Sequence, residues 1–309
     1  MMSMEQTVLA AKRPNLELRC QVMQIIRGFF FEAGFLEVHT PVLTPAPAPE
    51  LHIDAVPCTD GFLSTSPELY MKRLLAAGYG KIFQLAPAFR AGERGRLHHP
   101  EFMLLEWYRL GADYEALQTD CIELLRVICH RLGKGDGFRS QGTWLETRGP
   151  WQKVTVRDAF REFAGWEPGA DPHIDRFDMD LVEKVEPNLG SPTPTFVVDY
   201  PASQAALARL KTDAPTVAER FELYWAGIEL ANGFSELIDV REQRRRFHET
   251  NENRRLAGRI VYPVAEAFLQ SLQHLQPCAG IALGVDRLVL ILADAADLEE
   301  VVAFPPETL

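Results

Sequence analysis

Phe89–Tyr108 reads FRAGERGRLHHPEFMLLEWY and places basic, acidic and aromatic residues side by side. The apolar residues before it and the run Leu104–Tyr108 at its end predict two strands joined by a polar loop. Arg90 would stand where the first strand ends, and Glu101 and Glu106 on the returning strand. This arrangement suits a split pocket, in which a guanidinium binds a phosphate with two parallel hydrogen bonds and carboxylates bind an amine.

Helices and strands follow one another in irregular order around this stretch. Helical spacing of apolar residues predicts helices over 18–33, from Ser66-Pro67-Glu68 onward, over 114–132 and over 286–293. Strands are predicted near 35–38, 81–86, 104–108, 195–200, 222–232 and 280–285. Residues 133–150, rich in glycine and polar groups, are predicted to form a surface connection. Strands separated by helices with little β-α-β regularity favour an α+β fold with an antiparallel sheet.

The composition, 47% hydrophobic and 24% charged, is ordinary for a globular protein. No apolar run reaches the ~18 residues that cross a bilayer, and Met1–Lys12 lacks a signal-peptide pattern, so we expect a cytoplasmic protein without membrane contact. The formal net charge of -11 counts against a broad nucleic-acid surface. Five scattered cysteines without a CxxC pair argue against a disulfide framework or a zinc site, and Cys121 and Cys129 are expected to fill core.

Three further segments carry residues that are unusual for their positions. Thr65-Ser66-Pro67-Glu68 fits a helix start, with a capping serine, a proline in the first turn and a glutamate near the positive helix end. In FELYWAGIELANGFSELID (Phe221–Asp239), glutamates recur at 222, 229 and 236. Odd intervals alternate between the faces of a flat strand, so these glutamates share one pocket only if a turn or bulge intervenes. In GIALGVDRL (Gly280–Leu288), a strand runs into a helix whose early Arg287 opposes the dipole preference, which favours a functional role.

Together these segments resemble the three motifs of class II aminoacyl-tRNA synthetases. The matching residues are Gly34–Pro41 for motif 1, Phe89–Glu93 with Phe102 for motif 2, and Gly280, Ala282, Gly284 and Arg287 for motif 3. The resemblance runs from about Leu16 to Pro305. It implies the class II catalytic core, an antiparallel sheet flanked by helices, as a single domain over 1–309 with a flexible N-terminus over 1–15. It also implies a homodimer built on the motif 1 helix.

Within the class, TSPELYMKRLL, HPEFMLLEWY and ELANGFSEL resemble lysyl-tRNA synthetases. Those enzymes carry an N-terminal anticodon-binding domain, whereas this chain reaches motif 1 within its first forty residues. GIELANGFSEL and PASQAALARL (Pro201–Leu210) are similar to the short paralogues that ligate (R)-β-lysine or lysine to translation elongation factor P, the elongation factor P–(R)-β-lysine ligases. Ala282 also resembles these paralogues, because lysyl-tRNA synthetases usually have glycine at this position. Its methyl would favour a substrate whose amine is displaced by one carbon, by about 1–3 kcal/mol.

The resemblance implies an enzyme that uses ATP and Mg²⁺ to form an aminoacyl-adenylate and pyrophosphate, then transfers the aminoacyl group to a lysine ε-amine of elongation factor P. Its implied catalytic residues are Arg90 and Arg287, its implied Mg²⁺ ligands Glu222 and Glu229. The implied ATP-binding residues are Arg90, Glu93, His99, Phe102, Glu229, Leu230, Gly284 and Arg287, with adenine between Phe102 and Arg287. The implied substrate-binding residues are Ser66, Pro67, Glu68, Glu106, Tyr108 and Glu236. Of these, Glu68 and Glu106 would bind the amine near the carboxylate, and Tyr108 and Glu236 the distal ammonium.

The chain departs from the family pattern at two places. Its motif 2 loop reads Arg90-Ala91-Gly92-Glu93, where the family usually has Arg-Asn-Glu-Glu, and His99 replaces a usual asparagine. Adjacent His98 and His99 have poor spacing for a metal. The arginine-rich run Val240–Arg259 also contains acids and is predicted to be a solvated helix rather than a partner-docking face.

Three other functions stay open. The first is a truncated lysyl-tRNA synthetase that charges tRNA, which the acidic charge disfavours. The second is a catalytically silent regulatory paralogue, against which the retention of Arg90, Glu229 and Arg287 argues. The third is a free-amino-acid ligase like the short relative of asparaginyl-tRNA synthetase that makes asparagine, which the lysine-type pocket residues disfavour.

Overall fold

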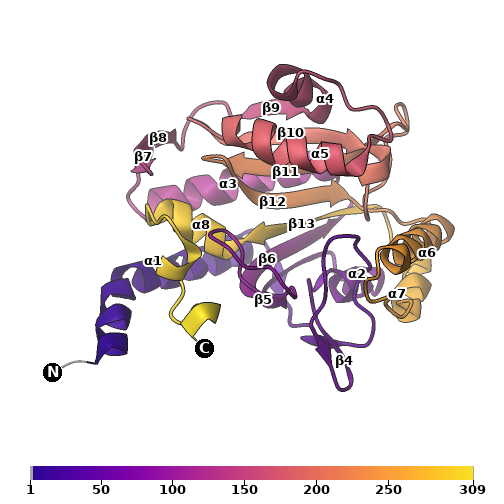
Figure 1. Ribbon diagram of the computed structural model, residues 1–309, viewed down its shortest axis with the longest axis horizontal. Coiled ribbons are helices and arrows are strands. Elements are labelled where there is room, and N and C mark those ends of the chain that lie inside the picture. The colour runs from indigo at the N-terminus through magenta and orange to yellow at the C-terminus, as the bar shows by residue number, and fades with distance from the viewer. Residues whose placement is uncertain (1–2, 309) are drawn as a thin grey trace.

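The computed structural model describes residues 3–308 and is built on one eight-stranded sheet (Figure 1). The strand order is β1-β5-β6-β13-β12-β11-β10-β9. In that order the strands are Leu36–Glu37, Lys81–Phe89, Glu101–Leu110, Cys278–Gly284, Ile228–Ser235, Val217–Trp225, Thr195–Pro201 and Gln152–Thr155. The central pairs are antiparallel, and β1 with β5 and β9 with β10 form parallel pairs at the two edges. The predicted α+β class with an antiparallel core is confirmed.

Three helices cover one face of this sheet: α1 (Met4–Glu32), α3 (Tyr114–Arg131) and α8 (Val285–Leu292). Asp113 starts α3 because its carboxylate accepts hydrogen bonds from the first free backbone amides of the helix. Alternate strand residues point into this layer, among them Trp107, which is fully buried and donates to Asp120 at 3.2 Å. Cys121 and Cys129 of α3 are buried in the same core, so the structural roles predicted for Trp107 and these cysteines are confirmed.

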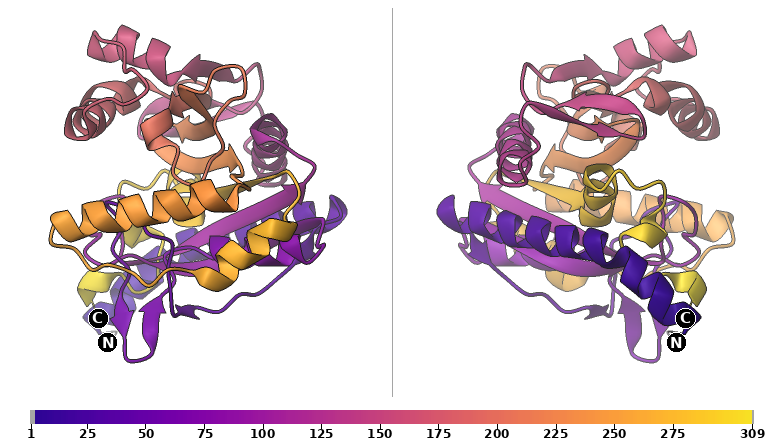
Figure 2. Two further views of the ribbon diagram at one scale, coloured as in Figure 1. Left: turned by 90° about the vertical axis from the view of Figure 1, so that its right-hand side faces the viewer. Right: turned by 90° about the vertical axis from the view of Figure 1, so that its left-hand side faces the viewer.

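The opposite face is covered at two ends and open between them. At one end lie α2 (Glu68–Ala76), α6 (Val240–Leu256) and α7 (Glu266–Ser271), beside the small sheet of β2 (Leu43–Thr44), β3 (Pro57–Cys58) and β4 (Gly61–Leu63). At the other end α4 (Val156–Ala159) and α5 (Ile174–Asp180) pack over β9 and β10. Figure 2 shows α1 in front of the sheet in one view and α6 and α7 in front in the other. The strip of β6, β13, β12 and β11 between the two ends carries the cavity described below.

Four predicted segments differ in detail. The strand predicted over 222–232 is two strands, β11 and β12, joined by a turn at Ala226–Gly227, where both residues have positive φ. The predicted connection 133–150 contains a hairpin of β7 (Gly137–Ser140) and β8 (Thr143–Glu146). The helix predicted after Ser66 begins at Glu68. Residues 4–15 are helical, since α1 begins at Met4; the mobility expected of 1–15 stays a prediction, and Met1 and Met2 lie outside the described residues.

No helix within residues 3–308 has both the length and the apolar character that crossing a bilayer requires.

Candidate active site

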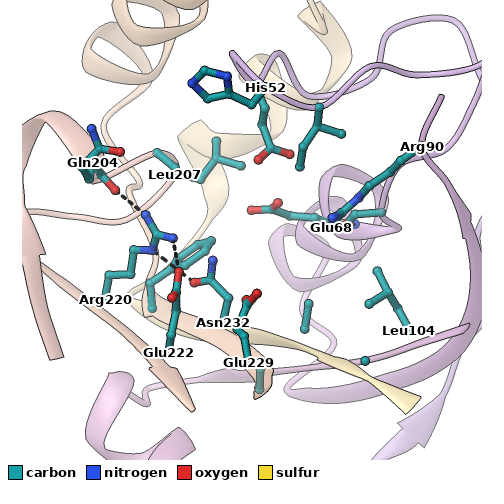
Figure 3. Close-up of a pocket in the computed structure, with 18 of the residues that line it drawn as sticks. His52, Glu68, Arg90, Leu104, Gln204, Leu207, Arg220, Glu222, Glu229 and Asn232 are labelled. Carbon is teal, nitrogen blue, oxygen red and sulfur yellow. Dashed lines mark hydrogen bonds and ion pairs between the residues drawn. The ribbon is translucent and has the colours of Figure 1, made fainter. Parts of the chain in front are cut away.

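A cavity of about 1040 Å³ lies over the open strip of the sheet. Figure 3 shows Glu68 and Arg90 on one side of it and Arg220, Glu222, Asn232 and Glu229 on the other. The predicted site residues that line it are Ser66, Glu68, Arg90, Glu93, His99, Phe102, Glu106, Tyr108, Glu222, Glu229, Leu230, Gly284 and Arg287. Pro67 and Glu236 are not among the described residues that line it, and the exposed Glu101 is not either. Glu101 was expected to share the pocket with Glu106, but the odd separation along β6 puts it on the other face.

The strand register explains how glutamates seven apart meet on one face. Glu222 of β11 pairs with Asn232 of β12, and Tyr224 pairs with Glu229. Leu230 is an extra residue between these pairs, so β12 carries a bulge there. The Ala226–Gly227 turn puts Glu222 and Glu229 on one face of the sheet despite their odd separation. The bulge does the same for Glu229 and Glu236. The spacing of the glutamates required a turn or a bulge, and this hairpin contains one of each.

One end of the cavity is built from hydroxyls and a carboxylate. Ser66 Oγ and Tyr108 Oη donate to the two oxygens of Glu106, at 2.6 and 2.8 Å. Ser66 Oγ also accepts a hydrogen bond of 3.0 Å from the Glu68 backbone amide, which fixes the hydroxyl at the start of α2. Burial, reinforced by the charge of Glu68, raises the pKa of Glu106 to about 7. A buried carboxylate in this arrangement is stabilised most in its ionised form by a ligand that carries positive charge.

A lysine that was not predicted as a site residue lies beneath the Ser66 and Glu106 end of the cavity. Lys72 of α2 is fully buried, with its Nζ 2.5 Å from Glu68 Oε1 and ion-paired to Glu236. Burial lowers the pKa of Lys72, but Glu236 and Glu68 outweigh it and raise the pKa above its ordinary value. Burial raises the pKa of Glu236 against the opposing effect of Lys72. Glu236 therefore lies beneath the cavity floor and contacts Lys72, so a direct contact with substrate stays a prediction.

Gly280 makes room for these groups. It pairs with Tyr108 of β6 and Phe234 of β12 in the middle of the sheet. A methyl carbon on Gly280 would lie 2.6 Å from Glu236 Oε1 and closer still to the Tyr108 ring. Glycine at this position is required by the close approach of neighbouring side chains. Ala282, two residues on, pairs with Glu106 and lines the cavity.

The cavity lining also includes an arginine with free hydrogen-bonding capacity. The Arg90 guanidinium lies over the Phe102 ring, 4.9 Å from its centroid, and 3.7 Å from Glu93. Its Nε is buried and has no hydrogen-bond partner within residues 3–308. Buried donors are normally satisfied, so this nitrogen is suited to bind an anionic or carbonyl oxygen.

Arg287 has several partners in the described chain. Its Nη1 is 3.0 Å from Glu229 Oε2 and 2.9 Å from the Glu229 carbonyl oxygen, and its Nη2 is 2.9 Å from His98 Nε2. Burial and the neighbouring Arg287 charge lower the pKa of His98, so this ring is neutral near pH 7. Burial would raise the pKa of Glu229, but Arg287 outweighs it and lowers the pKa. Within residues 3–308 no cluster of three metal-ligating side chains forms around His98 and His99.

Glu222 is the most enclosed acid at the β11 side of the cavity. It accepts from Tyr200 Oη and Tyr224 Oη, both at 2.6 Å, and from Arg220 Nη2 at 2.6 Å. Burial, reinforced by Glu229, raises its pKa. Two carboxylates on one face suit Mg²⁺, which uses one or two carboxylates with water and substrate phosphate for the rest. Glu222 and Glu229 thus fit an ion that arrives with a nucleotide.

A buried arginine holds the cavity wall made by residues 49–53. Arg254 of α6, fully buried, donates to the carbonyl oxygens of Glu50 (2.6 Å) and Ile53 (2.9 Å) and to Asp54 Oδ1 at 2.7 Å. A fourth hydrogen bond of 2.7 Å runs to the Ile260 carbonyl. Burial raises the pKa of Glu50, which lines the cavity. The helix predicted for the arginine-rich run is confirmed as α6, and most of its arginines are ion-paired.

Several site residues escaped prediction from the sequence. Lys72 stands four positions after Glu68, a helical spacing that brings oppositely charged side chains together, so this signal was readable. Arg220, which bridges Glu222 and Asn232, stands two residues before Glu222 and would face the same way on a strand. Arg254 and Glu50 are far apart in sequence, and no local pattern links them.

Comparison with known families agrees with this architecture. The family model described as tRNA synthetases class II (D, K and N) matches residues 4–308, so the chain belongs to that family. Membership implies the class II catalytic core and ATP-dependent activation and ligation of an amino acid, with Mg²⁺ in general use.

Proposed function

We propose that this class II protein activates a lysine-type diamino acid, (R)-β-lysine or lysine, and ligates it to a lysine ε-amine of translation elongation factor P. In this proposal it is a protein-lysine lysyltransferase that forms AMP and pyrophosphate. The observation that carries the proposal is that one cavity holds both kinds of charge: Arg90 presents a buried free donor, and Glu68 and Glu106 present carboxylates.

In the first step the substrate carboxylate attacks the α-phosphorus of ATP, forms a mixed anhydride and expels pyrophosphate. A carboxylate is already an anion, so this step needs no general base; positioning and neutralisation of charge supply the acceleration. Arg90 binds the α-phosphate through its free Nε, and Arg287 exchanges its contact with Glu229 for the distal phosphates. Phe102, which carries the Arg90 guanidinium on one face, stacks the adenine with Arg287. Glu93, His99, Leu230 and Gly284 complete the nucleotide site.

Mg²⁺ bound by Glu222 and Glu229 would neutralise phosphate charge and orient the leaving pyrophosphate. Tyr200, Tyr224 and Arg220 hold Glu222 in place for this role.

The substrate ammoniums bind at the carboxylates of the cavity. Glu68 and Glu106 hold the amine near the carboxylate, while Tyr108 and Glu236 serve the distal ammonium. Ser66 and Pro67 place the start of α2 beside both. A buried carboxylate without a partner is unfavourable, so two facing acids favour a ligand with more than one positive charge.

In the second step the neutral ε-amine of the acceptor lysine attacks the adenylate carbonyl; an amide bond forms, AMP leaves and the amine loses a proton. The similarity of GIELANGFSEL and PASQAALARL to the elongation factor P ligases supports this acceptor over tRNA. So does the pairing of the arginines on α6, because paired guanidiniums leave less positive charge for a phosphate backbone.

We also propose a homodimer in the cytoplasm. Leu36 within motif 1 and Phe31, Val42 and Leu43 just outside it are each at least 40% exposed. A run of exposed apolar side chains of this kind supports a protein interface. Light scattering coupled to size exclusion tests the dimer, and a Leu36→Glu variant should shift the mass to that of a monomer.

ATP–pyrophosphate exchange measured with L-lysine and (R)-β-lysine, followed by transfer to elongation factor P and to tRNA, tests the activity. We expect exchange with at least one of the two diamino acids and transfer to the protein. Charging of tRNA at the rate of protein modification would instead favour a lysyl-tRNA synthetase. Absence of exchange with both amino acids would favour the silent paralogue.

A further inference from the structure

We infer that Lys72 is a specificity-determining positioning residue whose built-in ammonium sets how much positive charge the substrate must bring. This inference rests on the proposed diamino-acid substrate. Lys72 does not line the cavity; it acts through the two glutamates that it holds.

The lysine is enclosed on every side. Its Nζ lies between Glu68, at 2.5 Å, and Glu236. The Phe234 and Phe268 rings stand 5.2 and 6.0 Å away, at distances typical of a cation over an aromatic face. One ammonium therefore joins a glutamate of the cavity wall to a glutamate beneath its floor. Rotation of either carboxylate away from this position would break a buried ion pair.

Charge counting shows the consequence for the ligand. Glu68, Glu106 and Glu236 together carry three negative charges when ionised, and Lys72 supplies one positive charge. The remaining two charges equal the two ammoniums of a lysine-type substrate, whose carboxylate faces Arg90 instead. An amino acid with an apolar side chain brings one ammonium and leaves a buried carboxylate either unpaired or protonated.

The pH response of the site follows from the same groups. Glu106 and Glu236 are faced by Glu68 and Lys72 of α2, by Tyr108 of β6 and by Cys278 of β13. Lys72 is the cation that lowers the pKa of both glutamates against burial. Removing its charge must shift their protonation to higher pH, and so weaken the binding of a dication over a wider range of pH.

Lys72→Met tests the inference, with Arg73→Met as the matched control. Arg73 is the next residue of α2, exposed, and stacks on Tyr70 away from the cavity. Calorimetric titration of each protein with L-lysine and with L-norleucine, which lacks the distal ammonium, measures the discrimination directly. We expect Lys72→Met to lose lysine affinity by at least about tenfold and norleucine affinity far less. The acidic limb of lysine affinity should move to higher pH, and the KM for ATP and the Arg73→Met protein should stay as in wild type.

A second variant keeps the test valid if Lys72→Met folds poorly. Lys72→Gln removes the charge but keeps a hydrogen-bond donor between Glu68 and Glu236, so the two buried carboxylates are not left without any partner. It should fold, and its preference for lysine over norleucine should fall as in Lys72→Met. Unchanged discrimination with an unmoved acidic limb in either folded variant would overturn the inference and assign Lys72 to folding alone. Wild-type protein that binds neither lysine nor (R)-β-lysine would instead overturn the proposed function.

Discussion

A single methyl group at Gly280 should separate the amino-acid site from the nucleotide site. In Gly280→Ala the new carbon would lie 2.6 Å from Glu236 Oε1, where ordinary contact starts at 3.4 Å, and the Tyr108 ring would be closer still. Both neighbours are fully buried and cannot swing into solvent. Reaching 3.4 Å requires the carboxylate to shift by about 0.8 Å and the ring, at 2.1 Å, by about 1.3 Å, which stretches the 2.8 Å hydrogen bond from Tyr108 to Glu106.

Overpacking of a well-packed site costs about 1–3 kcal/mol, equivalent to about 5–150-fold in affinity. We expect the KM for the diamino acid in pyrophosphate exchange to rise within that range, with a melting temperature lower by a few degrees and the KM for ATP changed less than about twofold. Gly80→Ala is the control, because nothing lies within 4 Å of its methyl position. A folded Gly280→Ala protein with an unchanged amino-acid KM would refute the placement of the substrate beside Tyr108.

Four further predictions address separate parts of the site. Arg254→Met should lower the free energy of unfolding by about 3–5 kcal/mol in chemical denaturation, because three carbonyls and Asp54 lose their buried donor. The control Arg255→Met, which breaks one exposed ion pair, should lower it by no more than about 1 kcal/mol. Glu106 binds an ammonium only when ionised and its pKa is raised to about 7, so the lysine KM should rise roughly tenfold per pH unit below 7, while a flat profile between about pH 5.5 and 7 would contradict this role. Ala282→Gly should shift the ratio of kcat/KM values toward L-lysine over (R)-β-lysine by no more than about 150-fold, and a shift the other way would argue against the methyl as a discriminator. Glu229→Gln should lower exchange by about 100-fold at any Mg²⁺ concentration while leaving lysine binding intact in calorimetry, and chelation of Mg²⁺ should abolish exchange in the wild type.

Local patterns predicted most of the elements, whereas the cavity residues that were predicted came mainly from the family resemblance. The strands on either side of the motif 2 loop, helix α3 and helix α8 all follow from apolar spacing, because each buries one face on the sheet. The family resemblance predicted that Arg90, Glu106 and Arg287 belong to one site, and all three line the cavity. The family resemblance also predicted which residues far apart in the sequence lie close together in the fold. Hydrophobic periodicity alone does not contain that information.

The errors arose where tertiary contacts override local signals. Residues 223–228 are apolar apart from Gly227, so a single glycine was the only local mark of the tight turn at Ala226 and Gly227. The ion pair between Glu236 and Lys72 was not predicted, because Lys72 reaches Glu236 from a separate helix. Glu101 was grouped with Glu106 by composition, although strand alternation already puts them on opposite faces.

The bulge at Leu230 also limits how this chain can vary in length. Loss of one residue between Glu229 and Glu236 would straighten β12 and turn one of these acids toward the layer of α3 and α8. A buried carboxylate among apolar side chains would then oppose folding, whereas substitutions of Leu230 that keep the backbone intact would not. Insertions and deletions should therefore be absent from this hairpin in functional variants, and a screen of single-residue deletions should find it far less tolerant than the hairpin of β7 and β8.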